Sequence, residues 1–186
     1  EMIRLINVCC DDITAEKLPT IDLEYLFLQI RIKSVGETSD ISMKCSKCET
    51  ENNFTVDLET AKVKREKEVS NIVKLTNDIS IELQYANYEA MKGLDITTDD
   101  TNTVEAFKLM ERCIVAVIQG EEVFTTDDFT EKELTKFMDS MSLEMFDGVQ
   151  KYLGSAPVLS IVTEYKCKTC ESQETVKLEG IGNFFD

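Results

Sequence analysis

Four of the seven cysteines form two C-x-x-C pairs, Cys45 with Cys48 and Cys167 with Cys170. Two residues between the cysteines let a tight turn direct both thiolates at one tetrahedral metal ion, so each pair can supply half of a metal site. Four thiolates around Zn²⁺ form a closed shell that leaves no position for a reactive water molecule. The spacing therefore predicts one structural zinc ion, bound by Cys45, Cys48, Cys167 and Cys170.

The residues around the two pairs also repeat, because each pair follows a lysine and precedes a glutamate. Four thiolates and one Zn²⁺ carry a net charge of roughly −2, which needs nearby donors or cations. The lysines placed to supply them are Lys44, Lys47, Lys166 and Lys168. Shared flanks are hard to produce by chance, so cysteines that bind no metal are the weaker alternative.

A C-x-x-C pair can also carry out thiol–disulfide exchange. In thioredoxin-like proteins the motif ends a strand and leads into a helix, whereas both pairs here lead into strand-like segments, residues 54–58 and 175–178. Exchange stays an alternative, and it predicts an exposed thiol of low pKa. Cys9, Cys10 and Cys113 are interpreted as buried or incidental thiols, and the odd number of cysteines indicates a reducing compartment.

Residues 41–43 and 159–165, which precede the pairs, also alternate between polar and apolar side chains. The sequence thus contains two copies of one pattern, in which a strand is followed by a C-x-x-C turn and a second strand. This repeated pattern is typical of a zinc ribbon. We therefore expect an α+β fold with a zinc-ribbon-like pair of C-x-x-C knuckles on a small antiparallel β-sheet. An inserted helical subdomain and an N-terminal helix complete the expected fold.

Apolar spacing and capping residues predict the helices. They cover residues 23–35 with Gly36 as the stop, residues 102–119 as the most buried helix with Cys113 on its apolar face, and two segments that begin after Thr130 and Ser142. Residues 71–76 and 79–85 predict a β-hairpin that extends the knuckle sheet. The expected divisions are an N-terminal helical segment (1–40), a first zinc knuckle (41–60), a linker and β-hairpin (61–101), an inserted helical subdomain (102–157), and a second zinc knuckle with the C-terminal tail (158–186).

The composition excludes several classes of function. Twenty Lys and Arg against 36 Asp and Glu give a net charge of −16, which disfavours nucleic acid and anionic lipid surfaces as partners. The chain has no histidine, so imidazole bases and Ser–His or Cys–His pairs are ruled out. No apolar run approaches the ~20 residues of a membrane span. We therefore expect a non-enzymatic protein that binds other proteins and has no small-molecule substrate.

Two segments leave alternatives open. Residues 121–147 contain nine acidic residues and two lysines, and they form either a docking face or the solvated surfaces of helices. Phe184 and Phe185 lie on a tail with nearby glycines, where they are either an exposed apolar plug for a partner or part of the core.

The order of these segments resembles a known family. A helix runs into residues 28–36, with the letters LQIRIKSVG, and is followed by the first C-x-x-C pair, a helical middle and the second pair. The chain closes with Leu-Glu-Gly and Asn-Phe-Phe within residues 178–185. This order resembles the baseplate hub subunit and hub assembly family of T-even-type contractile-tailed bacteriophages.

The resemblance implies a non-enzymatic protein that acts in assembly of the tail baseplate hub and binds other hub proteins. It implies a location in the host cytoplasm during assembly or in the virion tail baseplate, and a role as a stable subunit or as a chaperone-like assembly factor. It carries over Cys45, Cys48, Cys167 and Cys170 as zinc ligands. A zinc-ribbon adaptor of host transcription or translation machinery is the alternative, and a thiol–disulfide oxidoreductase is the second alternative.

Overall fold

The computed structural model describes residues 1–65, 69–94 and 103–185. The chain divides into two compact units, each with its own apolar core. Unit 1 consists of Glu1–Ala15, Ile21–Arg65 and Pro157–Asp186, and unit 2 consists of Glu16–Thr20 and Glu66–Ala156. Unit 2 is therefore mainly an insertion between the two parts of the chain that build unit 1.

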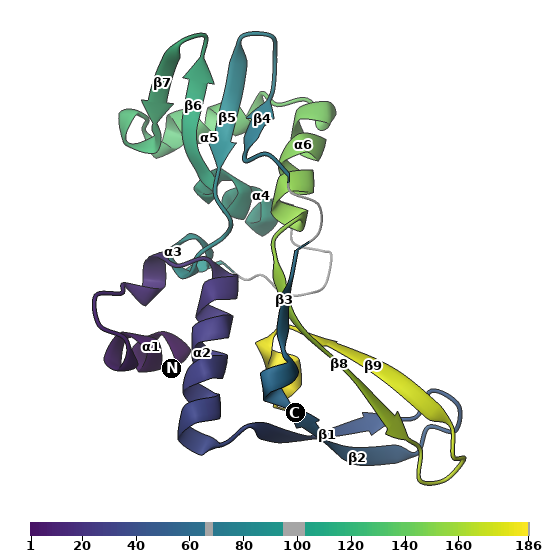
Figure 1. The fold of residues 1–186 in the computed structure, drawn as a ribbon. Helices are drawn as coiled ribbons and strands as arrows, with labels where there is room; N and C mark the ends of the chain where they lie inside the picture. The colour runs from purple at the N-terminus through teal and green to yellow at the C-terminus, as the bar shows by residue number, and fades with distance from the viewer. Residues whose placement is uncertain (66–68, 95–102, 186) are drawn as a thin grey trace. The chain divides into compact units, whose positions relative to one another are not determined.

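The elements that lie mainly in unit 1 come from both ends of the chain (Figure 1). They are α1 (Met2–Cys9), α2 (Thr20–Val35), β1 (Thr38–Lys44), β2 (Glu51–Asp57), β3 (Lys62–Lys64), β8 (Val158–Lys166) and β9 (Gln173–Glu179), with 3₁₀ turns at Leu58–Thr60 and Ile181–Phe184. A further 3₁₀ turn, Ala15–Lys17, has its first residue in unit 1 and its other two in unit 2. Strands β1 and β2 form a two-stranded antiparallel sheet. Strands β3, β8 and β9 form an antiparallel sheet in that order.

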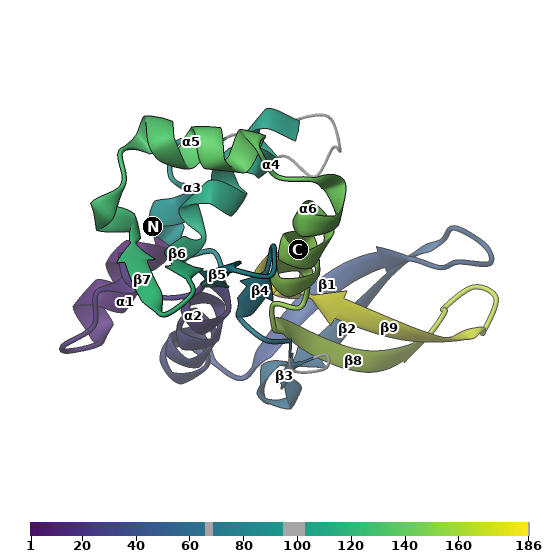
Figure 2. The same cartoon turned by 90° about the horizontal axis from the view of Figure 1, so that it is seen from above.

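Both C-x-x-C pairs lie in the turns of hairpins, one between β1 and β2 and the other between β8 and β9. The register pairs Lys44 with Glu51 beside the first turn and Lys166 with Gln173 beside the second. The two hairpins extend in the same direction, with their turns at the same end of the unit (Figure 2). The expected α+β fold with C-x-x-C knuckles on small antiparallel sheets is confirmed, although the knuckles lie on two separate sheets.

Alternation along the strands builds the core of unit 1, because successive side chains of a strand point to opposite faces. Ile41 and Val56 from the first hairpin are buried together with Ile161 and Leu178 from the second, and Leu28 of α2 packs in the same cluster. The rings of Phe54 on β2 and Tyr165 on β8 also stack across the two hairpins, with centroids 4.7 Å apart. The two hairpins therefore share one apolar core.

The C-terminal phenylalanines belong to this core. Phe184 is fully buried. The ring of Phe185 meets Phe27 edge-on at 6.2 Å and lies 5.7 Å from the guanidinium carbon of Arg31. Of the two alternatives for the tail, the packed one is correct and the exposed plug is wrong, because α2 offers apolar surface that the two rings cover.

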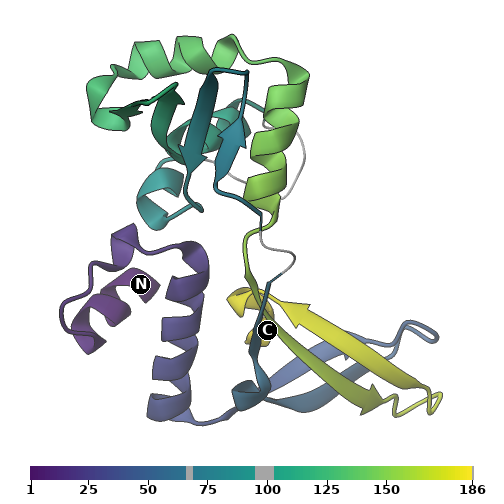
Figure 3. The same cartoon turned by 45° about the horizontal axis from the view of Figure 1, so that its top comes forward.

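Unit 2 combines a sheet with helices (Figure 3). Its elements are β4 (Ile72–Lys74), β5 (Ile79–Leu83), α3 (Tyr88–Met91), α4 (Thr103–Arg112), β6 (Ile114–Gln119), β7 (Glu122–Thr125), a 3₁₀ turn (Thr126–Asp128), α5 (Glu131–Asp139) and α6 (Leu143–Gly154). The four strands form an antiparallel sheet in chain order. Helix α6 approaches β4 so closely that a Cβ atom at Gly148 would lie 2.8 Å from Val73 Cγ1.

The helix predicted for residues 102–119 is wrong in its second half. Helix α4 ends at Arg112, Cys113 lies in the connection, and Ile114–Gln119 form β6. Helical and strand patterns compete here, and the β-branched side chains of β6 favour the strand once β5 and β7 flank it. None of the described side chains of α4 is fully buried, so the expectation of a most buried helix is also wrong. Asn102 lies outside the described residues.

The predicted hairpin at residues 71–85 forms as β4 and β5, but it pairs with β6 in unit 2. The prediction that it extends the knuckle sheet is therefore wrong. Residues 102–157, expected to be helical, also contain the strands β6 and β7. Alternation predicts a strand and its inward face, but it does not predict which distant strand becomes its neighbour.

The predicted helix boundaries agree with the structure at three places. Gly36, with φ of 135°, directly follows α2. Helix α5 begins after Thr130, whose backbone N–H and hydroxyl both donate to a carboxylate oxygen of Glu133 at 2.8 Å. Helix α6 begins after Ser142, whose Oγ accepts from the Met145 N–H.

Candidate metal centre

The four cysteines of the two C-x-x-C pairs meet in one cluster. Cys45 Sγ lies 3.6 Å from Cys170 Sγ, and Cys48 Sγ lies 3.5 Å from Cys167 Sγ. All four sulfur atoms lie within 4.8 Å of one another. The pairs in contact are 125 and 119 residues apart in the chain, so each short distance joins one hairpin to the other.

Each turn directs its sulfur atoms by the same backbone geometry. The residue after each pair, Glu49 or Glu171, has φ of 57°. Its N–H donates to the carbonyl of the first cysteine of its pair, at 2.9 Å in the first turn and 3.0 Å in the second. Left-handed backbone at a non-glycine residue needs support from its surroundings. Its recurrence at equivalent positions therefore marks the two turns as copies of one local structure.

Donors from the backbone and side chains surround the sulfur atoms. The Lys47 N–H donates to Cys45 Sγ at 3.4 Å, and the hydroxyl of Thr50 lies 3.3 Å from Cys48 Sγ. In the second turn, the backbone N–H groups of Cys170 and Thr169 lower the pKa of the Cys167 thiol to about 6. A thiolate is the form that binds metals, so the turn favours the ligand state at Cys167.

Cys170 differs from Cys167 in its protonation state, because its surroundings favour the thiol over the thiolate. The Ser172 N–H lowers the pKa of the Cys170 thiol, but the hydrogen bond with Cys48, the loss of contact with water and the hydrogen bond with Cys45 together raise this pKa to about 12. Cys170 is exposed, whereas Cys45 and Cys167 are buried. Metal binding must therefore displace a proton from Cys170, which makes binding dependent on pH.

Sequence reasoning missed two side chains at the cluster, Asn52 and Glu174. Asn52 is buried, accepts from the Lys168 N–H at 2.9 Å and places Nδ2 3.6 Å from Cys167 Sγ. Glu174 accepts from the Ser46 hydroxyl at 2.8 Å and lies 3.9 Å from Cys45 Sγ. Both residues lie on strands that follow a turn, so their alternation within the strand was visible, but their contacts with the opposite turn were not. Of the lysines expected to offset the cluster charge, Lys166 pairs with Glu171 instead, with Nζ 2.9 Å from the carboxylate.

The donor set fits a tetrahedral thiolate site. A tetrahedron with metal–sulfur bonds of about 2.3 Å has edges of about 3.8 Å between sulfur atoms. The two contacts of 3.5 and 3.6 Å approach this length, and no pair exceeds 4.8 Å. Four sulfur atoms with N–H donors around them suit Zn²⁺ or iron, so the ligand geometry by itself leaves the metal unidentified.

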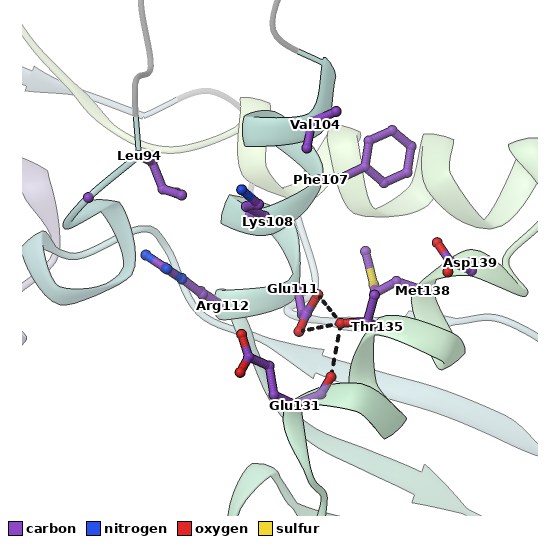
Figure 4. A pocket seen from close by; sticks show the side chains of 11 residues that line it. Leu94, Val104, Phe107, Lys108, Glu111, Arg112, Glu131, Thr135, Met138 and Asp139 are labelled. Carbon is purple, nitrogen blue, oxygen red and sulfur yellow. Dashed lines mark hydrogen bonds between the residues drawn. The ribbon is translucent and has the colours of Figure 1, made fainter.

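Unit 2 contains a pocket of about 570 Å³ lined mainly by α4 and α5 (Figure 4). The Thr135 hydroxyl lies 3.3 and 3.4 Å from the two carboxylate oxygens of Glu111. Burial raises the pKa of the Glu111 carboxyl, and the Thr135 hydroxyl partly offsets this. Arg112 donates to the carbonyls of Ala90 and Lys92, so it ties α3 to α4. These contacts hold the helices together, and we assign the pocket no chemistry.

Within the described residues, no helix combines the length and the apolar character that crossing a bilayer requires. A search of the curated proteins found no significant match to the chain, and a search of the solved structures also found none. A family model described as T4 bacteriophage base plate protein, however, matches residues 1–186. Because this match covers the whole sequence, the chain belongs to the T4 bacteriophage base plate protein family.

Proposed function

We propose that the chain is a non-enzymatic structural or assembly protein of the baseplate hub, which acts by binding other hub proteins. Family membership supports the baseplate role. The resemblance of the closing segment and of residues 28–36 to hub proteins supports the assignment to the hub. On this proposal the chain acts during assembly in the host cytoplasm and is found in the tail baseplate or its intermediates.

We further propose that Cys45, Cys48, Cys167 and Cys170 bind one structural Zn²⁺. The observation that carries this proposal is the convergence of four sulfur atoms from two hairpins, with contacts 125 and 119 residues apart in sequence. When bound, the ion cross-links the two hairpins. The cysteines then act only as ligands, because a four-sulfur shell leaves no open position for a substrate.

The position of the cysteine pairs also favours metal binding over disulfide exchange. Both pairs lie in turns between antiparallel strands. Reactive C-x-x-C cysteines instead gain their low pKa at the N-terminus of a helix or beside a cation. Sulfur contacts of 3.5 Å between Cys48 and Cys167 and of 3.6 Å between Cys45 and Cys170 also join different pairs, as expected for ligands of one ion.

Elemental analysis of the purified full-length protein tests the metal, and one zinc per chain is expected. Removing the metal with a chelator should expose four additional reactive thiols, which thiol counting before and after chelation detects. A protein purified from zinc-replete cells without metal, with all thiols already reactive, contradicts the zinc assignment.

The hub assignment is tested separately by tagging the chain in its phage and purifying tail intermediates during infection. We expect the chain in complexes that contain hub proteins. The assignment is wrong if the chain never enters such complexes and if its deletion leaves baseplate assembly unchanged. Co-purification with polymerase or ribosomal proteins instead would favour the host adaptor alternative.

A further inference from the structure

Asn52 and Glu174 occupy equivalent positions in the two hairpins, each seven residues after the first cysteine of its pair. Each side chain crosses to the opposite turn. Asn52 of β2 accepts from the Lys168 N–H in the second turn, and Glu174 of β9 accepts from the Ser46 hydroxyl in the first turn. The two hairpins therefore exchange side chains reciprocally around the cluster.

The two crossing side chains differ in what they offer a sulfur atom. Asn52 has an amide N–H₂, and its Nδ2 lies 3.6 Å from Cys167 Sγ while also donating to the Thr50 carbonyl at 2.7 Å. Glu174 has no N–H, and its Oε1 lies 3.9 Å from Cys45 Sγ. Hydroxyls of Ser46 and Ser172 donate to the Glu174 carboxylate at 2.8 to 3.0 Å and hold it in place.

The amide of Asn52 and the carboxylate of Glu174 have opposite electrostatic effects on a metal ion bound by four thiolates. An N–H donor stabilises the negative charge on a ligand sulfur and orients it. A carboxylate adds negative charge beside a cluster whose net charge is already roughly −2, and like charges at this separation repel. Equivalent positions in the two hairpins thus have opposite electrostatic effects on the same site.

We propose that Asn52 and Glu174 are positioning residues that set the metal affinity of the cysteine cluster in opposite directions, Asn52 strengthening binding and Glu174 weakening it. This inference rests on the proposed metal site and adds the residues that tune it. Asn52 acts through Cys167 and the backbone of the second turn, because the same side chain contacts both. Glu174 acts through Cys45 and limits how tightly the ion is held.

The test measures Zn²⁺ affinity of the full-length protein by competition with a chromophoric chelator. Asn52→Ala is expected to weaken binding about 10- to 100-fold, as found when groups that hydrogen-bond metal ligands are removed. Glu174→Gln keeps an acceptor for Ser46, removes the charge and is expected to strengthen binding about tenfold. Absorption spectra of the Co²⁺-loaded proteins report whether four-sulfur tetrahedral coordination is retained.

Matched controls lie in the same hairpins. Asn53 is exposed on β2 next to Asn52, and Glu164 is an exposed carboxylate on β8 that accepts from Gln173. Asn53→Ala and Glu164→Gln are expected to leave the affinity within about twofold of the original. If Asn52→Ala does not fold, Asn52→Asp keeps the size and loses the donor, and it is expected to weaken binding.

The inference is overturned if Asn52→Ala and Asn52→Asp bind Zn²⁺ as tightly as Asn53→Ala, or if Glu174→Gln weakens binding. These outcomes leave the proposed metal site intact. Failure of the unmodified protein to bind Zn²⁺ or Co²⁺ is a different result, which overturns the metal site itself together with this inference.

Discussion

At the scale of single residues, the four sulfur atoms depend on donors that the backbone supplies. The N–H of Lys47 reaches Cys45, and the N–H groups of Thr169 and Cys170 reach Cys167. Each turn also has one left-handed residue, Glu49 or Glu171, whose N–H donates to the carbonyl of the first cysteine of its pair. The cysteines and the turns that carry them are therefore one structural feature.

Replacing one cysteine of the cluster should destabilise the protein far more than replacing a cysteine elsewhere. We expect Cys45→Ser to lower the free energy of unfolding by several kcal/mol, because structural zinc supplies roughly 10 kcal/mol or more of apparent binding free energy coupled to folding. Thermal denaturation of the zinc-loaded protein measures the effect. Cys9→Ser, at an exposed position outside the cluster, is the control. Equal melting temperatures for the two variants contradict the prediction.

At the scale of elements, the start of α5 is the place where sequence and structure agree most closely. The Thr130 N–H and hydroxyl hydrogen-bond the Glu133 carboxylate and lower the pKa of that carboxyl below its ordinary value of 4.5. A carboxyl whose pKa is lower in the folded state stabilises folding above its unfolded pKa. This contribution disappears as the pH falls through the lower, folded-state pKa.

Glu133→Gln should therefore reduce stability at neutral pH, and the difference from the original protein should shrink as the pH falls below about 4.5. Urea denaturation at a series of pH values measures it. Glu131→Gln removes a carboxylate from the same turn of α5 but leaves the pairing with Thr130 in place. If Glu133→Gln and Glu131→Gln show the same pH dependence, the effect comes from the charge at the start of the helix and not from the pairing with Thr130.

At the scale of the whole molecule, the described residues form an apolar core in each unit, and the cysteine cluster lies on the two hairpins that build the core of unit 1. The core of unit 1 joins both hairpins to α2 and to Phe184, whereas the core of unit 2 joins its sheet to α5 and α6. Unit 1 is assembled from segments that a long insertion separates. Closing such a long loop costs conformational entropy, which a metal cross-link offsets.

Chelation should accordingly destabilise the two units unequally. With a strong chelator, calorimetry should resolve two transitions, and the transition of unit 1 should move to lower temperature while that of unit 2 stays in place. Hydrogen exchange assigns the transitions, because amides of β8 and β9 should lose protection while those of β5 and β6 keep it. A single transition that shifts as a whole would mean that the two units unfold cooperatively.

The sequence by itself determined the features that depend on neighbouring residues. The C-x-x-C turns, the strands around them, the end of α2 at Gly36 and the beginnings of α5 and α6 follow from local spacing and from side chains that bond the backbone within four residues. The helix expected at Ile114–Gln119 is wrong because its apolar spacing suits a helix locally, whereas in the structure the segment pairs with the distant strand β5 and with β7, which directly follows it.

The tertiary structure alone decided which segments meet. It buried Phe184, placed β4 and β5 beside β6, and brought Asn52 to Cys167 and Glu174 to Cys45. These contacts join residues far apart in the chain, and their energy depends on the apolar surface and hydrogen bonds that both partners bring. The local pattern specifies the secondary structure and the apolar face of each segment, but only the packing of the whole unit specifies which other segment that face contacts.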